Sequence, residues 1–301
     1  MRQASKAGKH TPEWVARPER SNVPTMRLIV WIALNLGRPA ARVLLLPIAA
    51  YFLLFSARAT RSASRAYLER VLGRKPAIRD LYRHYHTFAS VILDRVFLLG
   101  GCLDKLDVRL ENAEAVQTAL GAGRGCILLG AHVGSFEAIR AAGQQRQMPP
   151  ANLVMYEENA RKLNAVLHAI DPGLAQRIIP LGKPNAMLRV RDALARGEFV
   201  GMLADRVIEG EGSVACEFLG EPARFPTGPL RMAALMKAPV VVMAALYLGG
   251  NRYEVHFDPL PLPHQATEAD IAPAVQAYAA RIEHYCRIAP YNWFNFYDFW
   301  R

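Results

Sequence analysis

The order of apolar and polar residues divides the chain into a polar tail, an apolar segment and a long alternating region. Residues 1–25 are polar, basic and proline-containing, and we expect them to be poorly ordered. Residues 28–55 are mostly apolar, with interruptions at Gly37-Arg38-Pro39 and at Arg42. This pattern predicts three parts: a basic disordered tail (1–25), a membrane-associated segment (26–57) and a folded domain (58–301).

The apolar segment 28–55 fits three arrangements. Residues 43–55 are apolar and uncharged, but a straight membrane span needs ~20 residues. The whole segment is long enough, yet it carries two arginines near its middle, where charge is costly. A tilted span, a shallow re-entrant pair and a helix lying in the membrane interface all remain open. Basic residues flank both sides, so charge does not fix an orientation. The late start of the apolar run and the missing cleavage site argue against a signal peptide.

The rest of the chain alternates between helical and strand-like patterns. Apolar residues at helical spacing predict a helix over 76–99. Expected strands are 125–130, 151–156, 177–181, 199–204, 239–247 and 252–258, and further expected helices are 136–146, 159–170, 185–196, 228–237 and 268–287. Runs such as CILLG are apolar on consecutive residues, which is typical of strands covered on both faces. The pattern therefore predicts an α/β fold with a mixed, largely parallel sheet flanked by helices.

Charge changes the picture because it is unevenly placed. The chain has 301 residues and a net charge of +11. Residues 1–80 hold 15 Lys and Arg against 4 Asp and Glu, so they carry the whole excess of positive charge. Positive and negative side chains are equal in number in residues 81–301. A basic region beside an apolar run suits an anionic membrane surface, whereas a nucleic-acid reader would carry a basic face on its folded domain. The four cysteines have no metal-ligand spacing and indicate reduced thiols in a protein that faces the cytoplasm.

The stretch GAHVGSFEA, residues 130–138, carries the candidate chemistry. His132 and Glu137 are five positions apart, so they would not meet on one regular helix or strand. Gly134 permits a bend, and Ser135 is a good N-cap for a helix that starts at Phe136. The stretch then forms a strand, a tight turn and a helix, which places His132 at the carboxyl edge of the sheet, where sites form in α/β folds.

A carboxylate on one imidazole nitrogen leaves the other nitrogen free to accept a proton. With no cysteine nearby and no nucleophile elbow around Ser135, the pair is typical of a general base acting on a substrate hydroxyl. A capped helix start with a hydrogen-bonded structural histidine would have the same spacing, so the motif alone leaves both interpretations open.

The chain resembles the bacterial lipid A biosynthesis acyltransferase family, within the wider lysophospholipid acyltransferase superfamily. The resemblance runs over roughly residues 26–301 and rests on ILLGAHVGSFEAIR, EFVGMLADR, FLGEPARFPTGPLRMAALMKAPVV and the aromatic C-terminus. It implies transfer of a fatty acyl chain from a thioester, on acyl carrier protein or coenzyme A, to a hydroxyl of a membrane lipid. No metal or cofactor beyond the thioester co-substrate is implied.

The resemblance also implies roles for particular residues. His132 would be the base that deprotonates the hydroxyl, and Glu137 would orient it. Arg161, with Asn164 as a polar helper, would bind the oxyanion or an anionic headgroup. Asp205 would position substrate groups, and Arg206 would contact a phosphate or the carrier. A solvated helix arginine would explain Arg161 equally well, and a surface ion pair would explain Asp205 and Arg206 equally well.

Some residues depart from the family pattern. Ser135-Phe136 stands where lipid A enzymes commonly have Asn-Trp, and Thr227 replaces an acidic residue in the FPTGP block. The ending YNWFNFYDFW also differs. Core packing is the main interpretation of its aromatic residues, and a wall of an acyl channel or a membrane-interface belt are the alternatives. The resemblance therefore implies the reaction type more firmly than lipid A as the acceptor.

We expect an acyltransferase at the bacterial inner membrane, with its catalytic domain facing the cytoplasm. Its partners would be an acyl carrier protein or acyl-coenzyme A, a membrane lipid acceptor and the membrane surface, and no nucleic acid. A hydrolase or thioesterase on the same fold and a non-catalytic membrane-binding protein are the alternatives. The acceptor lipid, acyl length, donor, topology of residues 28–55 and oligomeric state stay open.

Overall fold

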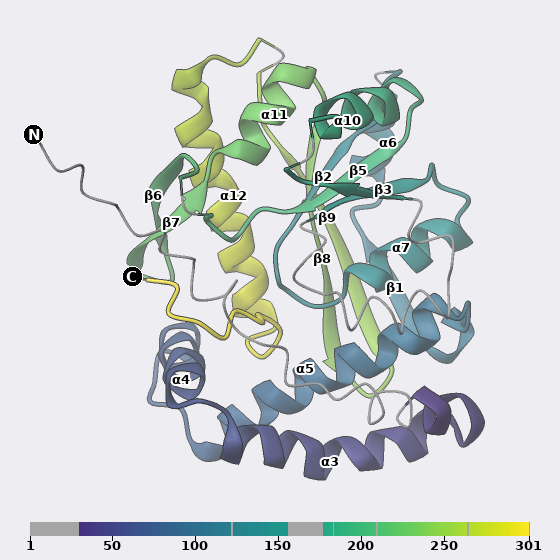
Figure 1. The fold of residues 1–301 in the computed structure, drawn as a ribbon, viewed down its shortest axis with the longest axis vertical. Helices are drawn as coiled ribbons and strands as arrows, with labels where there is room; N and C mark the ends of the chain where they lie inside the picture. The colour runs from purple at the N-terminus through teal and green to yellow at the C-terminus, as the bar shows by residue number, and fades with distance from the viewer. Residues whose placement is uncertain are drawn as a thin grey trace, which may run out of the picture.

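A mixed seven-stranded sheet with helices on both faces forms the centre of the molecule (Figure 1). The structure, a computed structural model, describes residues 30–121, 123–155, 177–182, 184–208, 210–263 and 265–300. The strands of the sheet are β1 (Asp107–Glu111), β2 (Ile127–Gly130), β3 (Ala151–Met155), β4 (Ile178–Pro180), β5 (Phe199–Leu203), β8 (Val240–Gly249) and β9 (Arg252–Leu260). The helices are α3 (Gly37–Phe55), α4 (Arg58–Leu72), α5 (Ile78–Leu99), α6 (Glu114–Leu120), α7 (Phe136–Gln145), α10 (Ala186–Ala195), α11 (Gly228–Met236) and α12 (Glu268–Ile288). Residues 30–35 are also helical, Leu103–Lys105 form the 3-10 helix η1, and β6 (Ser213–Phe218) and β7 (Glu221–Pro226) form a separate hairpin.

The strand order confirms the predicted fold class. It is β1-β9-β8-β2-β5-β3-β4, and every neighbouring pair is parallel except β8 and β9. Strand β2 lies between β8 and β5, with Gly130 opposite Leu203 in the β2–β5 register. Because these strands are parallel, the segments that follow Gly130 and Leu203 leave the sheet at the same edge.

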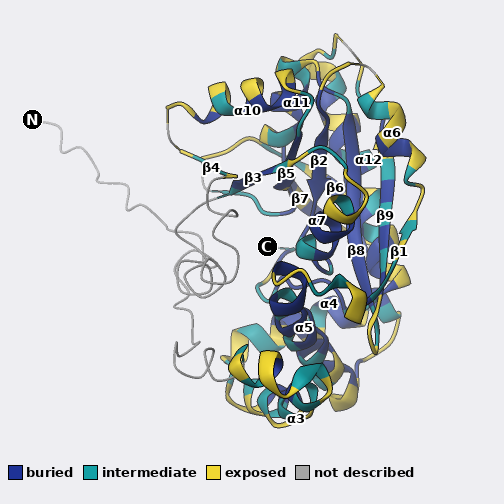
Figure 2. Ribbon diagram, turned by 90° about the vertical axis from the view of Figure 1, so that its right-hand side faces the viewer, coloured by how far each residue is buried: buried dark blue, intermediate teal, exposed yellow. Residues whose placement is uncertain are grey.

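The side chains of consecutive β2 residues pack into two hydrophobic clusters, one on each face of the sheet. Ile127 and Leu129 pack on the face covered by α10, α11 and α12, while Leu128 packs on the face covered by α6 and α7. All four residues of the strand are buried, as the dark central strands in Figure 2 show. The uninterrupted apolar run is therefore explained by helices on both faces.

The predicted elements form wherever the structure describes them, and some elements escaped prediction. All six predicted strands are present with ends within two residues of those expected, and so are the helices predicted at 76–99, 136–146, 185–196, 228–237 and 268–287. The helix predicted at 159–170 lies outside the described residues. The elements not predicted are α4, η1, β1, α6 and the β6–β7 hairpin. The hairpin turns at Leu219 and Gly220, which both have positive φ, and its strands bury only alternate positions near that turn.

Helix α3 lies along α5 at one end of the molecule (Figure 1). Four residues at helical spacing form its buried stripe: Ala41, Leu45, Ala49 and Leu53. Among the described residues, α3 is the one helix long and apolar enough to cross a membrane, and 22% of its 18-residue apolar window is buried. The division into tail, membrane-associated segment and domain stays a prediction.

Candidate active site

His132 lies two residues beyond the carboxyl end of β2. The ladder continues past the strand, because the Ala204 amide donates to the Gly130 carbonyl at 2.9 Å. The Tyr278 hydroxyl, which belongs to α12, donates to the same carbonyl at 2.8 Å. The backbone that carries His132 is therefore anchored on both sides, and one quarter (26%) of the histidine side chain remains exposed.

Gly134 makes the turn that the sequence predicted. Its φ is +66°, and a Cβ atom there would lie 1.8 Å from the Ala245 carbonyl oxygen, so only glycine fits this approach to β8. The next residue, Ser135, donates its amide to that carbonyl at 2.9 Å. Its hydroxyl then accepts the Ala138 amide at 3.3 Å and caps α7, as predicted.

Asp205 is the carboxylate that holds His132. It lies two residues beyond the end of β5, as His132 does beyond β2, so the parallel register brings the two together. The Nδ1 atom of His132 is 2.7 Å from Oδ1 of Asp205, and the His132 amide donates to Oδ2 at 3.0 Å. Asp205 has no exposed surface. This double contact fixes both the ring and the backbone of the histidine.

A C-terminal segment, residues 292–295, completes the shell around Asp205. Trp293 donates its indole N–H to Oδ2 of Asp205 at 3.3 Å, and Asn295 donates its amide to the same oxygen at 2.7 Å. Asn292 bonds the amide and the carbonyl of Tyr247 in β8, so the segment is tied to the sheet. The aromatic ending therefore packs in the core, with Trp293 99% buried, and also supplies hydrogen bonds to the site.

A buried histidine supports this segment from the other side. The Nε2 atom of His84 lies 2.8 Å from the Trp293 carbonyl, and its Nδ1 atom lies 2.7 Å from the Ser64 hydroxyl. Burial lowers the pKa of His84 to about 4, so it stays neutral at physiological pH. His84 is thus a packing histidine, and it links α4 and α5 to the residues around Asp205.

The electrostatics of the pair favour a neutral imidazole beside a carboxylate. Burial lowers the pKa of His132; Asp205 opposes this, and the nearby charge of Arg206 adds to it. Burial also disfavours ionised Asp205, but its contacts with His132 and the charge of Arg206 hold the pKa of that carboxyl below its usual range. Asp205 therefore accepts a hydrogen bond from the Nδ1–H group, and Nε2 is the basic nitrogen. No hydrogen bond within the described ranges uses Nε2.

The predicted contact between His132 and Glu137 is not formed. Glu137 lies in the first turn of α7, as expected, but it forms an ion pair with Arg95 of α5. Its other described contact is the Ser135 hydroxyl at 3.5 Å. The turn at Gly134 directs α7 toward α5, while His132 stays beside β5. Asp205, which follows the neighbouring strand β5, makes the contact with His132 that the spacing of the motif had predicted for Glu137.

Arg206 lies beside the pair and is held by two side chains. Its Nε donates to the Asn295 carbonyl oxygen at 2.8 Å, and its guanidinium lies 5.7 Å from the ring centre of Tyr297. Asn295 therefore joins Asp205 and Arg206, and an exposed surface ion pair does not describe either residue. Arg161 and Asn164, the other predicted substrate-binding residues, lie outside the described part of the chain.

Metal-binding clusters and cavities were sought in the rest of the described chain. Within the described ranges, no three of His, Cys, Asp and Glu gather as metal ligands. A cavity of about 240 Å³ lies beside α7, lined by residues that include Phe136, Ile139, Arg140 and Phe199. It adjoins the amino ends of β3 and β5, and His132 is not among its lining residues.

The described chain is thus an α/β protein in which a buried aspartate holds a partly exposed histidine at the carboxyl edge of a mixed sheet. The model of the family described as bacterial lipid A biosynthesis acyltransferase matches residues 22–301. The chain therefore belongs to this acyltransferase family, which confirms the resemblance noted in the sequence. A search of curated proteins gave no match. Family membership makes the protein a transferase that uses an acyl donor and a lipid acceptor.

Proposed function

We propose that the protein transfers a fatty acyl chain from a thioester to a hydroxyl of a membrane lipid such as a lipid A precursor, with His132 as the general base. The observation that carries this proposal is the hydrogen bond of 2.7 Å between Nδ1 of His132 and buried Asp205. In this arrangement Nδ1–H donates a hydrogen bond to the ionised carboxylate, and Nε2 is the nitrogen that we propose accepts a proton from the acceptor hydroxyl.

The reaction then runs in two proton steps. Nε2 of His132 removes the hydroxyl proton while the oxygen attacks the thioester carbonyl carbon. The resulting imidazolium is stabilised by Asp205, as in other carboxylate–histidine pairs. When the tetrahedral intermediate collapses, the carbon–sulfur bond breaks and the thiolate takes the proton back from His132. The products are the lipid ester and the free thiol of the donor.

The oxyanion requires hydrogen-bond donors beyond the backbone of the turn. The amides of Val133, Gly134 and Ser135 already donate to the carbonyls of other residues. We therefore propose side-chain donors: Arg161, with Asn164 as a helper, for the oxyanion, and Arg206 for a phosphate of the donor or acceptor. Glu137 is proposed as a positioning residue that acts through Arg95, because that ion pair ties the start of α7 to α5.

Labelled acyl transfer tests the proposal directly. Wild type and His132→Ala would be incubated with membrane lipid and a labelled thioester, in parallel on acyl carrier protein and on coenzyme A. We expect a labelled lipid from one donor, and at least a hundredfold slower formation in His132→Ala. His284→Ala, which removes an exposed histidine of α12, is the matched control.

The same assay separates the alternatives. Label released as free fatty acid, with no lipid product, would favour a hydrolase. Label transferred equally well by His132→Ala would overturn the role of the base. We further propose that the protein acts at the bacterial inner membrane with the site facing the cytoplasm, where both thioester donors occur.

A further inference from the structure

Asn295 bridges Asp205 and Arg206, the two charged residues that act on His132. Its side chain is buried, with 1% of the residue exposed. Its Nδ2 donates to Oδ2 of Asp205 at 2.7 Å, and its Oδ1 accepts the Nε–H of Arg206 at 2.8 Å. Exchanging the two ends of the amide would set its oxygen against a carboxylate and its N–H groups against a guanidinium. The charges on either side therefore fix the orientation of Asn295.

The two oxygens of Asp205 serve different donors. Oδ2 accepts three uncharged groups: the His132 amide at 3.0 Å, the Trp293 indole at 3.3 Å and the Asn295 amide at 2.7 Å. Oδ1 accepts the Nδ1–H group of His132 at 2.7 Å. The neutral donors satisfy the buried oxygen without cancelling the charge of the carboxylate. That charge is thus kept for the imidazole.

Arg206 is the cation that competes with His132 for this carboxylate. Its charge acts on both Asp205 and His132. Within the described ranges, however, no ion pair joins Arg206 to Asp205, and its Nε–H is directed to Asn295. An arginine that reached a carboxylate would form a charge-assisted and often bidentate contact, which is stronger than a hydrogen bond from a neutral imidazole. Such a contact would draw Oδ1 away from His132.

The other described groups that act on Asp205 carry no charge at physiological pH. They are Tyr278 and Cys286 of α12, and Tyr297. Burial raises the pKa of each of these three groups above its ordinary value, so all of them stay protonated. While His132 is neutral, the charge of Arg206 is therefore the one that decides how strongly Asp205 can stabilise an imidazolium.

The C-terminal segment holds its place beside His132 through its backbone. Val133 and Trp293 pair as an antiparallel bridge. The Phe294 amide donates to the His132 carbonyl at 2.7 Å. The same stretch of backbone thus positions both the histidine and Asn295, and the Asn295 side chain takes no part in these contacts.

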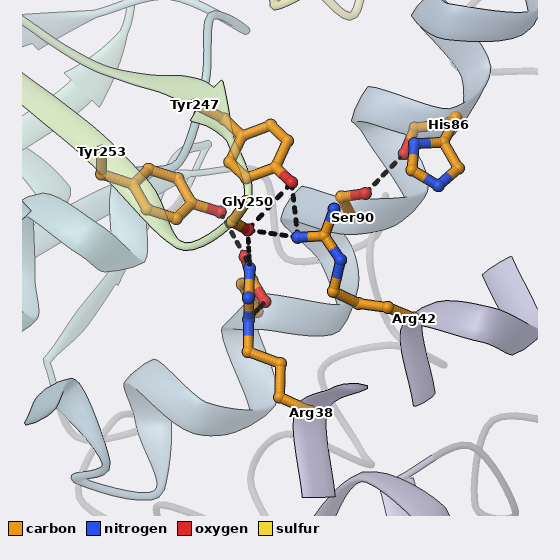
Figure 3. Close-up of polar contacts among 8 residues, drawn as sticks. Arg38, Arg42, His86, Ser90, Tyr247, Gly250 and Tyr253 are labelled. Carbon is orange, nitrogen blue, oxygen red and sulfur yellow. Dashed lines mark hydrogen bonds and ion pairs between the residues drawn. The ribbon is translucent and has the colours of Figure 1, made fainter. Parts of the chain in front are cut away.

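The segment has a further anchor on β8. The Asn292 side chain bonds both backbone groups of Tyr247. The Tyr247 hydroxyl accepts a hydrogen bond from Arg42 at 2.6 Å and donates to the Gly250 carbonyl at 3.2 Å (Figure 3). This anchor does not use Asn295 either. The segment is therefore fixed independently of the amide that lies between the two charges.

We propose that Asn295 is a positioning residue that keeps Arg206 apart from Asp205 and so reserves Oδ1 of this carboxylate for His132. Its effect on catalysis rests on the proposed role of His132 as the base. Without the amide, Arg206 moves onto Asp205, the two charges cancel and the imidazolium loses its counter-ion. Proton transfer then slows, although neither member of the His132–Asp205 pair has been changed.

Titration of His132 tests this role without any substrate. The ring nitrogens would be followed by nuclear magnetic resonance in the full chain with isotope-labelled histidine, and His132→Ala identifies the signal. In Asn295→Ala the midpoint should move to lower pH by roughly one pH unit, because a carboxylate paired with arginine stabilises the imidazolium less. In an Arg206→Gln background, Asn295→Ala should leave the midpoint almost unmoved, since no cation is left to be kept away.

Single-turnover acyl transfer at saturating donor gives the second readout. Asn295→Ala should be roughly tenfold slower than wild type, which corresponds to a change of one pH unit in the stability of the imidazolium. The loss should nearly vanish in the Arg206→Gln background, so the two changes should be far from additive. A role in packing alone would give the same loss in both backgrounds.

Asn292→Ala is the matched control, because it removes a buried amide of the same segment that contacts neither charged residue. It should leave the midpoint of His132 in place. An unmoved midpoint in Asn295→Ala, or equal shifts with and without Arg206, would overturn the proposal.

The two readouts also separate this proposal from the proposed function. The expected shift of the His132 midpoint, in a wild type that transfers no acyl chain, would support the role of Asn295 and overturn the reaction instead. If Asn295→Ala does not fold, Asn295→Ser takes its place, because the shorter side chain cannot reach both partners. The same shift and the same dependence on Arg206 are expected of it.

Discussion

Asp94 and Asp205 each hold a basic side chain, and their comparison separates a structural pair from the pair that we propose for proton transfer. Asp94 and Asp205 are both fully buried. Asp94 receives two nitrogens of Arg38 and the Tyr253 hydroxyl. Asp205 receives the amide and ring nitrogen of His132, together with Trp293 and Asn295. Both carboxylates are thus surrounded by donors.

The partners make the difference. Arginine keeps its charge at every physiological pH and uses its donors on Asp94 and Gly250, so this pair only joins α3 to the domain. Histidine can exchange a proton near neutral pH, and one of its nitrogens is left over after Asp205 is bound. A buried carboxylate can therefore assist proton transfer only when its partner changes protonation state near neutral pH and has a second nitrogen that is not bound to the carboxylate.

The largest expected effect comes from removing the charge of Asp205. Asp205→Asn should lower the rate of acyl transfer by about 10²–10⁴-fold, because the imidazolium of His132 loses its stabilising carboxylate and the ring its fixed tautomer. Single-turnover transfer from the preferred thioester measures this. Asp104→Asn, which changes an exposed aspartate, is the control. Wild-type turnover of Asp205→Asn would contradict the role proposed for Asp205 and its contrast with Asp94.

The corresponding change in the structural pair should affect stability instead. Asp94→Asn leaves Arg38 without its buried counter-ion and should reduce the free energy of unfolding by about 3–5 kcal/mol. Tyr253→Phe, which removes a single hydrogen bond to the same carboxylate, should cost only about 1 kcal/mol. Denaturant unfolding measures both. Loss of turnover in folded Asp94→Asn, with unchanged stability, would contradict the assignment of a purely structural role to Asp94.

A smaller and more specific effect concerns the pH profile. The active form of His132 is neutral, so activity should fall as the pH drops through its pKa, which burial places below the usual 6.5. Arg206 lowers this pKa and Asp205 raises it. Arg206→Gln should therefore move the acidic limb of kcat/KM to higher pH, and the residual activity of Asp205→Asn should have its limb at lower pH. Shifts in the same direction would contradict the assignment of charges around His132.

The smallest effect is expected from the carboxylate that local spacing favoured. Glu137→Gln should leave the acidic limb of the pH profile unmoved, because Glu137 pairs with Arg95 and not with His132. Comparison of pH profiles for Glu137→Gln and wild type tests this, with Arg95→Gln as the partner variant. A shift of the acidic limb of the pH profile in Glu137→Gln would indicate that Glu137 does influence the pKa of His132.

The sequence predicted the fold through features that are local or periodic. Consecutive apolar runs identified the strands, and Gly134 with Ser135 identified the turn and the helix cap. The hairpin β6–β7 escaped because only part of each short strand is buried and its turn, Leu219-Gly220, lacks a strong signature. Such segments gain their structure from packing against α12, which no local pattern records.

The site was predicted in part, for the same reason. His132 and Asp205 were both found, but they were not paired, because they are 73 positions apart and meet only through the β2–β5 register. A signal was present: both residues follow buried runs by the same number of positions, which places them at the same height on neighbouring parallel strands. Trp293 and Asn295 carried no such signal, since their hydrogen bonds to Asp205 depend on the course of the whole chain.

The participation of residues 292–295 also sets an order of events during biosynthesis. Helices α3 and α5 emerge from the ribosome before any strand of the sheet, whereas Trp293 and Asn295 emerge after all of its strands. The shell of donors around Asp205 therefore stays incomplete until every strand of the sheet has been made. The surroundings of Asp205 are thus among the last parts of the described fold to be completed.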